Sequence, residues 1–377
     1  MNPRELDLSR LKVRPLDERE SLAEVDDVLV SPDAPLPALP AAQQAAVELC
    51  AQNIRAAREA DASVILIYGA HLLRNGAAPI IERLLDNRWI THLATNGAGT
   101  IHDWEFAWLG RSTENVERGV AAGNFGAWDE TGRNIMLALL VGGLRGEGYG
   151  EALGRFICED GVDLPNLADL AASIQLAPAA PLTPARAEML RVSREHRLRP
   201  GHHKVVHRWK HASILATAWR LGVPVTAHPG IGYDIVACHP MFDGAAIGRA
   251  AEIDFRIFSK AVEKLDGGVV LSIGSAIMGP QIFEKSLSCV HNLRFQEGRG
   301  PVSGHAIHVV DLQDGEGWDW SAGEPPKTHP AYYLRFCKSY SRMGGAMHYA
   351  QCDNLRFIHA LGQALGRAPE KTESLAP

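Results

Sequence analysis

Several features are missing from this chain of 377 residues, and each absence narrows its possible functions. The sequence has no long basic run and a formal net charge of −6, which argues against nucleic acid as a partner because phosphate binding relies on clustered lysines and arginines. It also lacks any stretch of about 18 uninterrupted apolar residues, so we expect no membrane association. The polar start from Met1 to Asp7 has no apolar segment typical of a secretion signal. Together these absences predict a cytoplasmic protein.

The six cysteines include no Cys-x-x-Cys pair. Scattered cysteines of this kind are typical of reduced thiols in a reducing compartment, several of them buried. A metal site is not expected from them.

Three histidines, His203, His207 and His211, recur at every fourth position. On a helix this spacing would place three imidazoles on one face, within reach of a metal ion. Basic residues alternate with them and no acidic residue lies among them, so we favour a surface or subunit-contact helix over a metal site.

Continuous apolar runs alternate with helix patterns along most of the chain. The runs at 64–68 and 268–273 are typical of strands buried on both faces, and further strands are predicted just before Asn96 and at the ranges 223–227, 305–310 and 346–350. Helices are predicted at 41–60, 209–221, 245–265 and 354–365. This alternation predicts an α/β fold, with a mostly parallel sheet and helices on both faces.

The domain organisation follows from composition. Residues 1–45 combine a charged stretch with a proline-rich stretch at 31–40, which predicts an N-terminal arm. Residues 46–370 are predicted to form a single Rossmann-like domain with a helical insertion at about 114–200. Two separate domains are the alternative.

Two glycine-containing turns follow predicted strands, at Asn96-Gly97-Ala98-Gly99 and at Gly274-Ser275. Glycine lets a backbone approach a pyrophosphate closely, and the N-terminus of the following helix attracts anions. Similar turns also occur in α/β proteins that bind nothing there. A third turn carries His228 and Asp234, at the sheet edge where such folds place ligands, and a simple turn is the alternative.

Lys338 lies between the aromatic residues Phe336 and Tyr340. A lysine becomes a nucleophile only where burial or neighbouring charge lowers its pKa, because the ammonium form has no lone pair. The alternative is an ordinary surface lysine.

In order, the segments 68–76, 96–103, 223–234, 267–275 and 336–338, followed by Asp353, resemble the blocks of deoxyhypusine synthase. The resemblance covers roughly residues 60 to 366. It implies an NAD-dependent homotetramer with one Rossmann-like domain per subunit. Enzymes of this family oxidise spermidine with NAD, capture the aminobutyl group on a lysine as an imine, and pass it to a lysine of a translation factor.

The resemblance also implies roles for individual residues. Lys338 falls on the imine-forming lysine, Phe336 replaces the family's tryptophan, and Asp353 falls on an aspartate that contacts NAD. The cofactor-binding residues expected on this basis are His71, Asn96, Gly97, Ala98, Gly99, Gly274, Ser275, Asp311, Asp353 and Asn354. The expected catalytic residues are Lys338, His102 and Asp234, and the expected substrate-binding residues are His228, Gln281, Glu284 and Phe336.

The sequence departs from the family where the polyamine binds. The polyamine-holding run becomes 279–284, the acidic stretch becomes 314–319, and a Glu-Glu pair becomes Ile101-His102. A dicationic substrate needs paired carboxylates to offset its desolvation, so we expect a small amine other than spermidine. The resulting hypothesis is an NAD-dependent transferase that holds an imine on Lys338 and passes the fragment to an amine. Its alternatives are a net NAD-dependent amine oxidoreductase and a non-catalytic NAD-binding scaffold.

Overall fold

The computed structural model describes residues 4–367, so the outermost residues of the expected arm and domain, 1–3 and 368–370, lie outside it. The strands are β1 (Ala23–Glu24), β2 (Val64–Tyr68), β3 (His92–Asn96), β4 (Arg111–Ser112), β5 (Gly161–Leu164), β6 (Gly201–Lys204), β7 (Val225–His228), β8 (Val269–Ile273), β9 (Ala306–Asp311) and β10 (Ala346–Gln351). The longer helices that flank the sheet or pack beside it are α2 (Ala41–Glu59), α4 (Ala78–Asp86), α5 (Gly97–Leu109), α7 (Asp129–Arg145), α8 (Tyr149–Cys158), α11 (Ile214–Leu221), α12 (Gly244–Glu263), α13 (Met278–Gln296) and α15 (Asn354–Gly366). The remaining α-helices are α1 (Val25–Val28), α3 (Ala70–Arg74), α6 (Val116–Ala122), α9 (Leu167–Leu176), α10 (Thr183–Glu195) and α14 (Arg335–Ser341).

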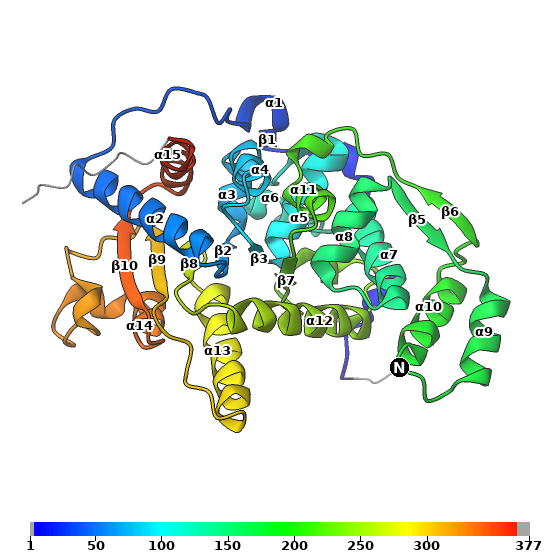
Figure 1. Cartoon of the computed structure of the whole chain (residues 1–377). Coiled ribbons are helices and arrows are strands. Elements are labelled where there is room, and N and C mark those ends of the chain that lie inside the picture. Colours follow the sequence, from blue (N-terminus) through cyan, green and yellow to red (C-terminus); the bar gives the residue numbers. More distant parts are fainter. Residues whose placement is uncertain (1–3, 368–377) are drawn as a thin grey trace, which may run out of the picture.

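Six strands form one parallel sheet in the order β10-β9-β8-β2-β3-β7 (Figure 1). If these six strands are renumbered 1 to 6 in chain order, starting with β2, the sheet read from β7 to β10 has the order 3-2-1-4-5-6. This is the strand order of dinucleotide-binding Rossmann folds. The strand order reverses between β2 and β8. The predicted α/β fold with a Rossmann-like parallel sheet is therefore confirmed.

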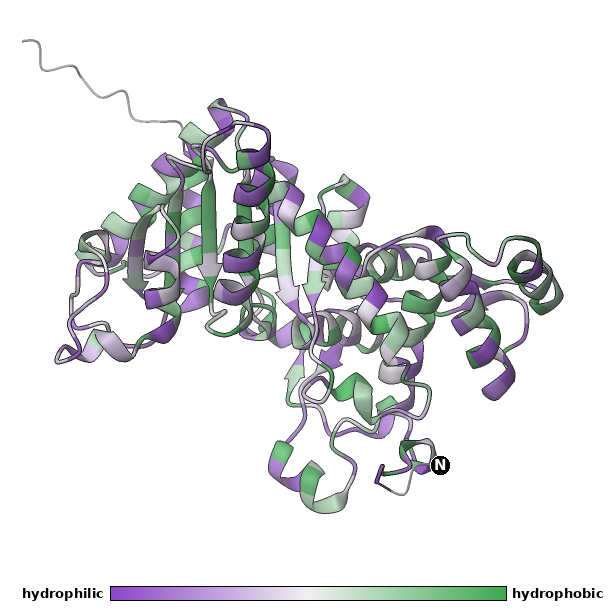
Figure 2. Ribbon diagram, turned by 90° about the horizontal axis from the view of Figure 1, so that it is seen from below, coloured by the Kyte–Doolittle hydropathy of each residue, from purple (hydrophilic) through white to green (hydrophobic). Residues whose placement is uncertain are grey.

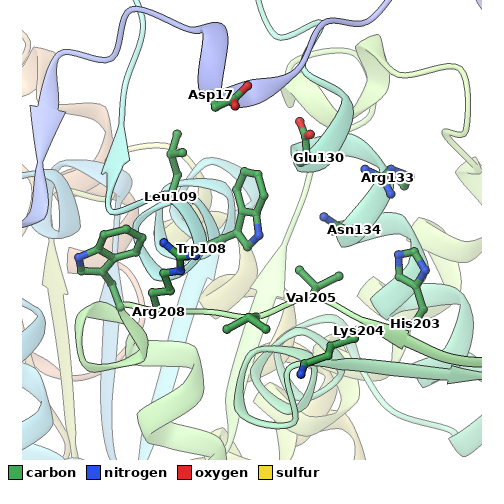
Figure 3. Close-up of a pocket in the computed structure, with 12 residues that line it drawn as sticks. Asp17, Trp108, Leu109, Glu130, Arg133, Asn134, His203, Lys204, Val205 and Arg208 are labelled. Atoms are coloured by element: carbon green, nitrogen blue, oxygen red, sulfur yellow. The ribbon is translucent and has the colours of Figure 1, made fainter.

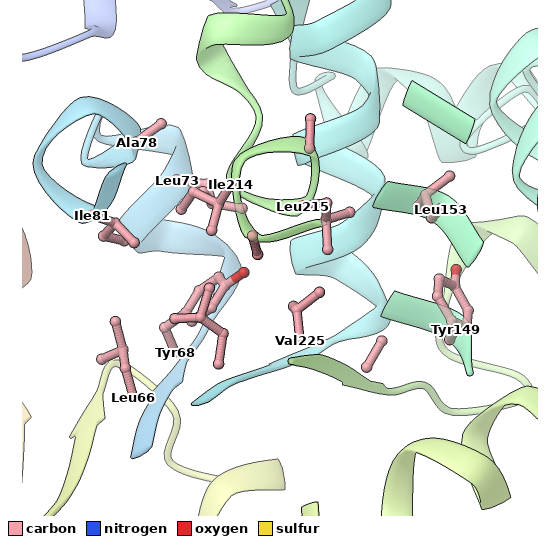
Figure 4. Packing of buried hydrophobic residues seen from close by; sticks show 14 of the residues in the cluster. Leu66, Tyr68, Leu73, Ala78, Ile81, Tyr149, Leu153, Ile214, Leu215 and Val225 are labelled. Carbon is pink, nitrogen blue, oxygen red and sulfur yellow. The ribbon is translucent and has the colours of Figure 1, made fainter. Parts of the chain in front are cut away.

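The central strands divide the core into two layers. Residues 64, 66 and 68 of β2 pack into one hydrophobic cluster, whereas residues 65 and 67 pack into another. Successive side chains of a strand point to opposite faces, so β2 must be apolar at every position, as its sequence is. Figure 2 shows apolar strands between helices that carry polar outer sides, and Figure 4 shows Leu66 and Tyr68 in the cluster that also contains Leu215 and Val225.

The segment between β4 and β7 contains six α-helices, α6 to α11, and one antiparallel strand pair, β5 with β6. Helices α7 and α8 pack beside the β7 end of the sheet, whereas α9 and α10 lie at the periphery (Figure 1). The sequence predicted a helical insertion here, and the strand pair is an addition to it.

The N-terminal arm runs along the domain of its own chain. Leu16 is fully buried, β1 pairs with β4, and Arg19 forms an ion pair with Glu105 of α5. The arm therefore contributes both apolar and charged side chains to the interior.

Two local predictions are wrong. The helix expected from residue 209 starts only at Ile214, after Ser213, whose hydroxyl accepts a hydrogen bond from the Ala216 N–H. The predicted histidine helix does not exist either, because His203 lies in β6 and His207 in a loop where its N–H donates to Asp160. Pairing with β5 satisfies this backbone instead of a helix.

Two kinds of feature are absent from the described residues. Within residues 4–367, no group of three metal-ligating side chains lies together. No helix in the same range has both the length and the apolar character that a membrane crossing requires.

Candidate functional site at the carboxyl edge of the sheet

The carboxyl ends of the six parallel strands meet at one edge of the sheet. In open α/β sheets ligands bind outside this edge, at the point where the strand order reverses. Gly69 and Gly274 directly follow β2 and β8, and Asp353 follows β10. The last residues of β3, β7 and β9 are Asn96, His228 and Asp311. Most of the residues predicted from the sequence therefore belong to one side of the molecule.

The turns after β2 and β8 are in close contact at the reversal point. A β-carbon on Gly69 would lie 2.3 Å from the carbonyl oxygen of Gly274. Gly274 has a φ of +59°, and a β-carbon there would lie 2.4 Å from Nδ2 of Asn354. Close approach of the backbone excludes a side chain at both positions, and at Gly274 the left-handed φ disfavours one as well.

Asn354 is the first residue of α15 and is 8% exposed. Its Oδ1 is buried and has no hydrogen-bond partner among the described residues. A buried acceptor without a partner costs free energy, so Oδ1 is a natural acceptor for a donor on a bound molecule.

The other predicted cofactor residues near this crevice cap local structure. The hydroxyl of Ser275 accepts from the Gly279 N–H at 3.1 Å. Asp353 accepts from the Arg356 N–H at 2.9 Å, and Asp311 accepts from the Gln313 N–H at 3.1 Å. Their side chains are therefore held in place by their own turns, which leaves them oriented at the edge.

The turn after β3 meets the turn after β7. Oδ1 of Asn96 accepts from the Gly99 N–H at 2.8 Å and caps α5. The carboxylate of Asp234 lies directly against Gly97, and it accepts from the Gly230 N–H at 2.7 Å. Burial raises the pKa of Asp234 to about 6. This carboxyl can therefore both accept and release a proton near neutral pH.

His102 lies in the second turn of α5, close to α3. Its Nδ1 is 2.7 Å from the Ser112 hydroxyl, and burial lowers its pKa to about 4. His71, which is exposed on α3, also lowers the pKa of His102. At neutral pH His102 is uncharged, so it can exchange hydrogen bonds but carries no positive charge to a ligand.

The side chain of His228, the last residue of β7, packs against α12. Its ring centroid lies 5.5 Å from that of Phe258, and its Nε2 lies 3.1 Å from the Thr226 hydroxyl. Burial lowers its pKa to about 4. These contacts hold His228 as a neutral ring packed against α12.

Lys338 lies on α14, with partners from the preceding irregular segment. Its Nζ is 2.9 Å from Glu324 and 3.3 Å from the ring centroid of Tyr332. Burial would lower the pKa of Lys338, but Glu324 and Tyr332 outweigh it, so the pKa is raised. The lowered pKa that a nucleophilic role would require is therefore not found in this arrangement, in which Phe336 and Tyr340 pack into the core instead of enclosing the amine.

Two predicted substrate residues, Gln281 and Glu284, are exposed on α13. Glu284 pairs with the adjacent Lys285 at 2.7 Å. The structure therefore places them on an outer helix face, whereas Asp234 and Asn354 are buried at the edge.

Two features of this region were missed from the sequence. Gly69 is the first residue after the fully apolar strand β2, which is the available signal for its place at the reversal point. The Lys338 partners Glu324 and Tyr332 come from a segment without periodicity, so no sequence signal links them to α14.

The strand order and the glycine turns define a Rossmann-like α/β protein. Neither the family models nor the curated proteins compared with this sequence match it. Solved structures are similar over most of the chain: unliganded AgrE has 13% identity over 87% of this chain and 33% of its own, with a TM-score of 0.43. A conserved putative LOR/SDH protein from Methanococcus maripaludis S2 has 13% identity over 94% of this chain and 74% of its own, with a TM-score of 0.41.

A putative deoxyhypusine synthase from Entamoeba histolytica has 11% identity over 72% of this chain and 80% of its own, with a TM-score of 0.31. This chain spans about a third of the length of AgrE. At these scores the likenesses carry no functional assignment, so the assignment must rest on the residues of this chain.

Proposed function

We propose that this protein is an NAD-dependent enzyme that oxidises a small amine at the carboxyl edge of the sheet. The observation that carries the proposal is the reversal point between β2 and β8, where Gly69, Gly274 and Asn354 meet. A dinucleotide lies across this point in sheets of the same strand order.

The residues present fit such a cofactor. Gly69 and Gly274 leave backbone without side chains at the reversal point, and the Asn354 Oδ1 is an acceptor that has no donor among the described residues. Gly69, Gly274 and Asn354 would hold the dinucleotide, with Ser275 and Asp353 beside them. When bound, NAD would supply a hydride acceptor.

Asp234 would accept a proton from the substrate ammonium group. An amine is an ammonium ion at neutral pH and must lose a proton before a hydride can leave the adjacent carbon. A carboxyl with a pKa of about 6 is ionised at pH 7 and accepts that proton. Asp311 and Asp353, at the ends of β9 and β10, would add negative charge that attracts the cation.

The environment of Lys338 bears on which reaction follows. A transferase that stores an imine on Lys338 needs its neutral amine, whereas the ion pair with Glu324 favours the ammonium form. Net oxidation needs no free lysine amine. We therefore favour an NAD-dependent amine oxidoreductase, with the lysine-linked transferase as the second candidate.

Calorimetric titration with NAD+ and NADP+ tests the cofactor. Asn354→Ala should raise the Kd for NAD+ at least about tenfold, the equivalent of one lost hydrogen bond. Asn292→Ala, on an exposed part of α13, is the matched control and should leave the Kd unchanged. Absence of NAD+ binding to the wild-type protein would contradict the proposal.

A second experiment separates the two reactions. A panel of small amines, with ornithine among them, is tested with NAD+. Steady growth of NADH absorbance supports net oxidation. No growth, together with a borohydride-trapped adduct on Lys338, supports the transferase.

A further inference from the structure

A pocket of about 560 Å³ lies near the carboxyl end of α5, away from the edge of the sheet. The 13 residues of α5 span about 18 Å, so Gly97 at the edge and Leu109 at the pocket are well separated. The pocket is lined by Asp17, Trp108, Leu109, Glu130, Arg133, Asn134, His203, Lys204, Val205, Val206, Arg208 and Trp209 (Figure 3).

Most of the charges in this pocket are separated, and the third cation of its wall, Arg133, lies beside Glu130 and pairs with Asp129 at 2.8 Å (Figure 3). Asp17 and Glu130 lie on one side, and Lys204 and Arg208 lie across from them (Figure 3). Glu130 uses one oxygen to accept the Leu16 N–H at 2.7 Å. Lys204 and Arg208 are both exposed, so both cations are accessible to a ligand.

Two polar atoms in the pocket wall have no partner. Asn134 is 2% exposed, and its Oδ1 has no hydrogen-bond partner among the described residues. Nε2 of His203 is likewise buried without one. Unsatisfied buried groups are rare because each costs free energy, so their convergence on a pocket points to a bound polar molecule.

The remaining wall is apolar and aromatic. Trp108 stacks on Trp104, with ring centroids 5.4 Å apart and planes 15° apart, which fixes its orientation. Leu109, Val205 and Trp209 complete this wall. Such a surface suits an apolar or aromatic side chain.

We propose that this pocket binds a free α-amino acid with an apolar or aromatic side chain. Its ammonium group would face Asp17 and Glu130, and its carboxylate would face Lys204 and Arg208. A ligand with only a negative charge would have no positive group to pair with the two carboxylates of the pocket. A ligand with only a positive charge would have no negative group to pair with the two cations. The site does not depend on the function proposed for the edge of the sheet.

Isothermal titration with three related probes tests the charge requirement. L-Phenylalanine has both charges, 3-phenylpropionate lacks the ammonium, and 2-phenylethylamine lacks the carboxylate. We expect a Kd below about 1 mM for L-phenylalanine and at least about tenfold weaker binding of the other two. Equal binding of 3-phenylpropionate, or no binding of L-phenylalanine, would overturn the proposal.

Variants locate the binding. Arg208→Ala and Asn134→Leu should each weaken L-phenylalanine binding at least about tenfold, with the first acting through charge and the second through the buried amide. Lys285→Ala removes an exposed cation on α13 and is the control. Circular dichroism confirms that each variant folds, and unchanged affinity in folded Arg208→Ala would refute the assignment.

Discussion

Replacement of Arg19 by alanine is the sharpest test of how the arm is attached. Arg19 and Glu105 are 4% and 1% exposed, and two hydrogen bonds of 2.8 Å join the guanidinium to the carboxylate. Breaking a buried pair by removing one partner costs about 3–5 kcal/mol, because the other charge stays buried. The hydroxyls of Ser112 and Thr131 still donate to Glu105, which favours the lower end of this range.

Urea denaturation followed by fluorescence measures this cost. Arg118→Ala is the matched control, because Arg118 pairs with Glu20 on the surface, where the side chains are 64% and 71% exposed. An exposed pair contributes about 0–1 kcal/mol. A loss below about 1 kcal/mol for Arg19→Ala would refute the interpretation of a buried, stability-determining pair.

The pH dependence of this variant gives a second readout. Burial alone would raise the pKa of Glu105, but Arg19 outweighs it and the pKa is lowered. In the wild type this group therefore contributes stability above its unfolded pKa, and the contribution is lost as the pH falls through the folded pKa. Without Arg19, burial should raise the folded pKa above the unfolded value, so that stability falls as the pH rises between them. An unchanged pH slope would contradict this account.

Three further outcomes are expected. If Asp234 accepts the substrate proton, kcat/KM should rise with pH through an apparent pKa of about 6, and Asp234→Asn should abolish that limb; a wild-type profile flat across this range would exclude the role. Gly274→Ala should destabilise the protein by more than Gly267→Ala, because Gly267 has a similar φ of +66° but open space around its α-carbon. Equal losses of stability of about 1 kcal/mol for the two variants in thermal unfolding would contradict the packing argument. Light scattering should give about four times the chain mass of 40.9 kDa if the homotetramer predicted from the family resemblance forms, and Lys338→Arg should leave this mass unchanged; a monomer would count against it.

The sheet could be predicted from the sequence because its strands carry a strong local signal. Residues 64–68 are apolar throughout, and the structure has β2 at Val64–Tyr68. The expected strand at 305–310 is shifted by one residue from β9, and the one at 346–350 is one residue shorter than β10. Buried parallel strands are continuous apolar runs, so periodicity and composition suffice to find them.

Contacts between distant segments could not be predicted in the same way. Arg19 lies in a charged stretch whose sequence is typical of a solvent-exposed tail. Only the structure shows that Arg19 forms a buried ion pair with Glu105. The four-residue spacing of His203 and His207 is typical of a helix, but pairing with β5 overrides it. The state of Lys338 depends on Glu324, which comes from an irregular segment and has no fixed spacing from α14.

Helix α5 carries two buried acidic side chains whose hydrogen-bond partners come from separate parts of the chain. Glu105 is paired by Arg19 from the arm, whereas Asp103 accepts the Ile214 N–H at 2.7 Å and a hydrogen bond from the Ser213 hydroxyl. Burying either carboxylate without its partners would be costly, so each depends on a segment distant in the sequence. Arg19 is made before Glu105, so the arm cannot complete its buried pair until the chain has been extended through α5. Asp103 depends in the same way on residues 213 and 214, which are made after it.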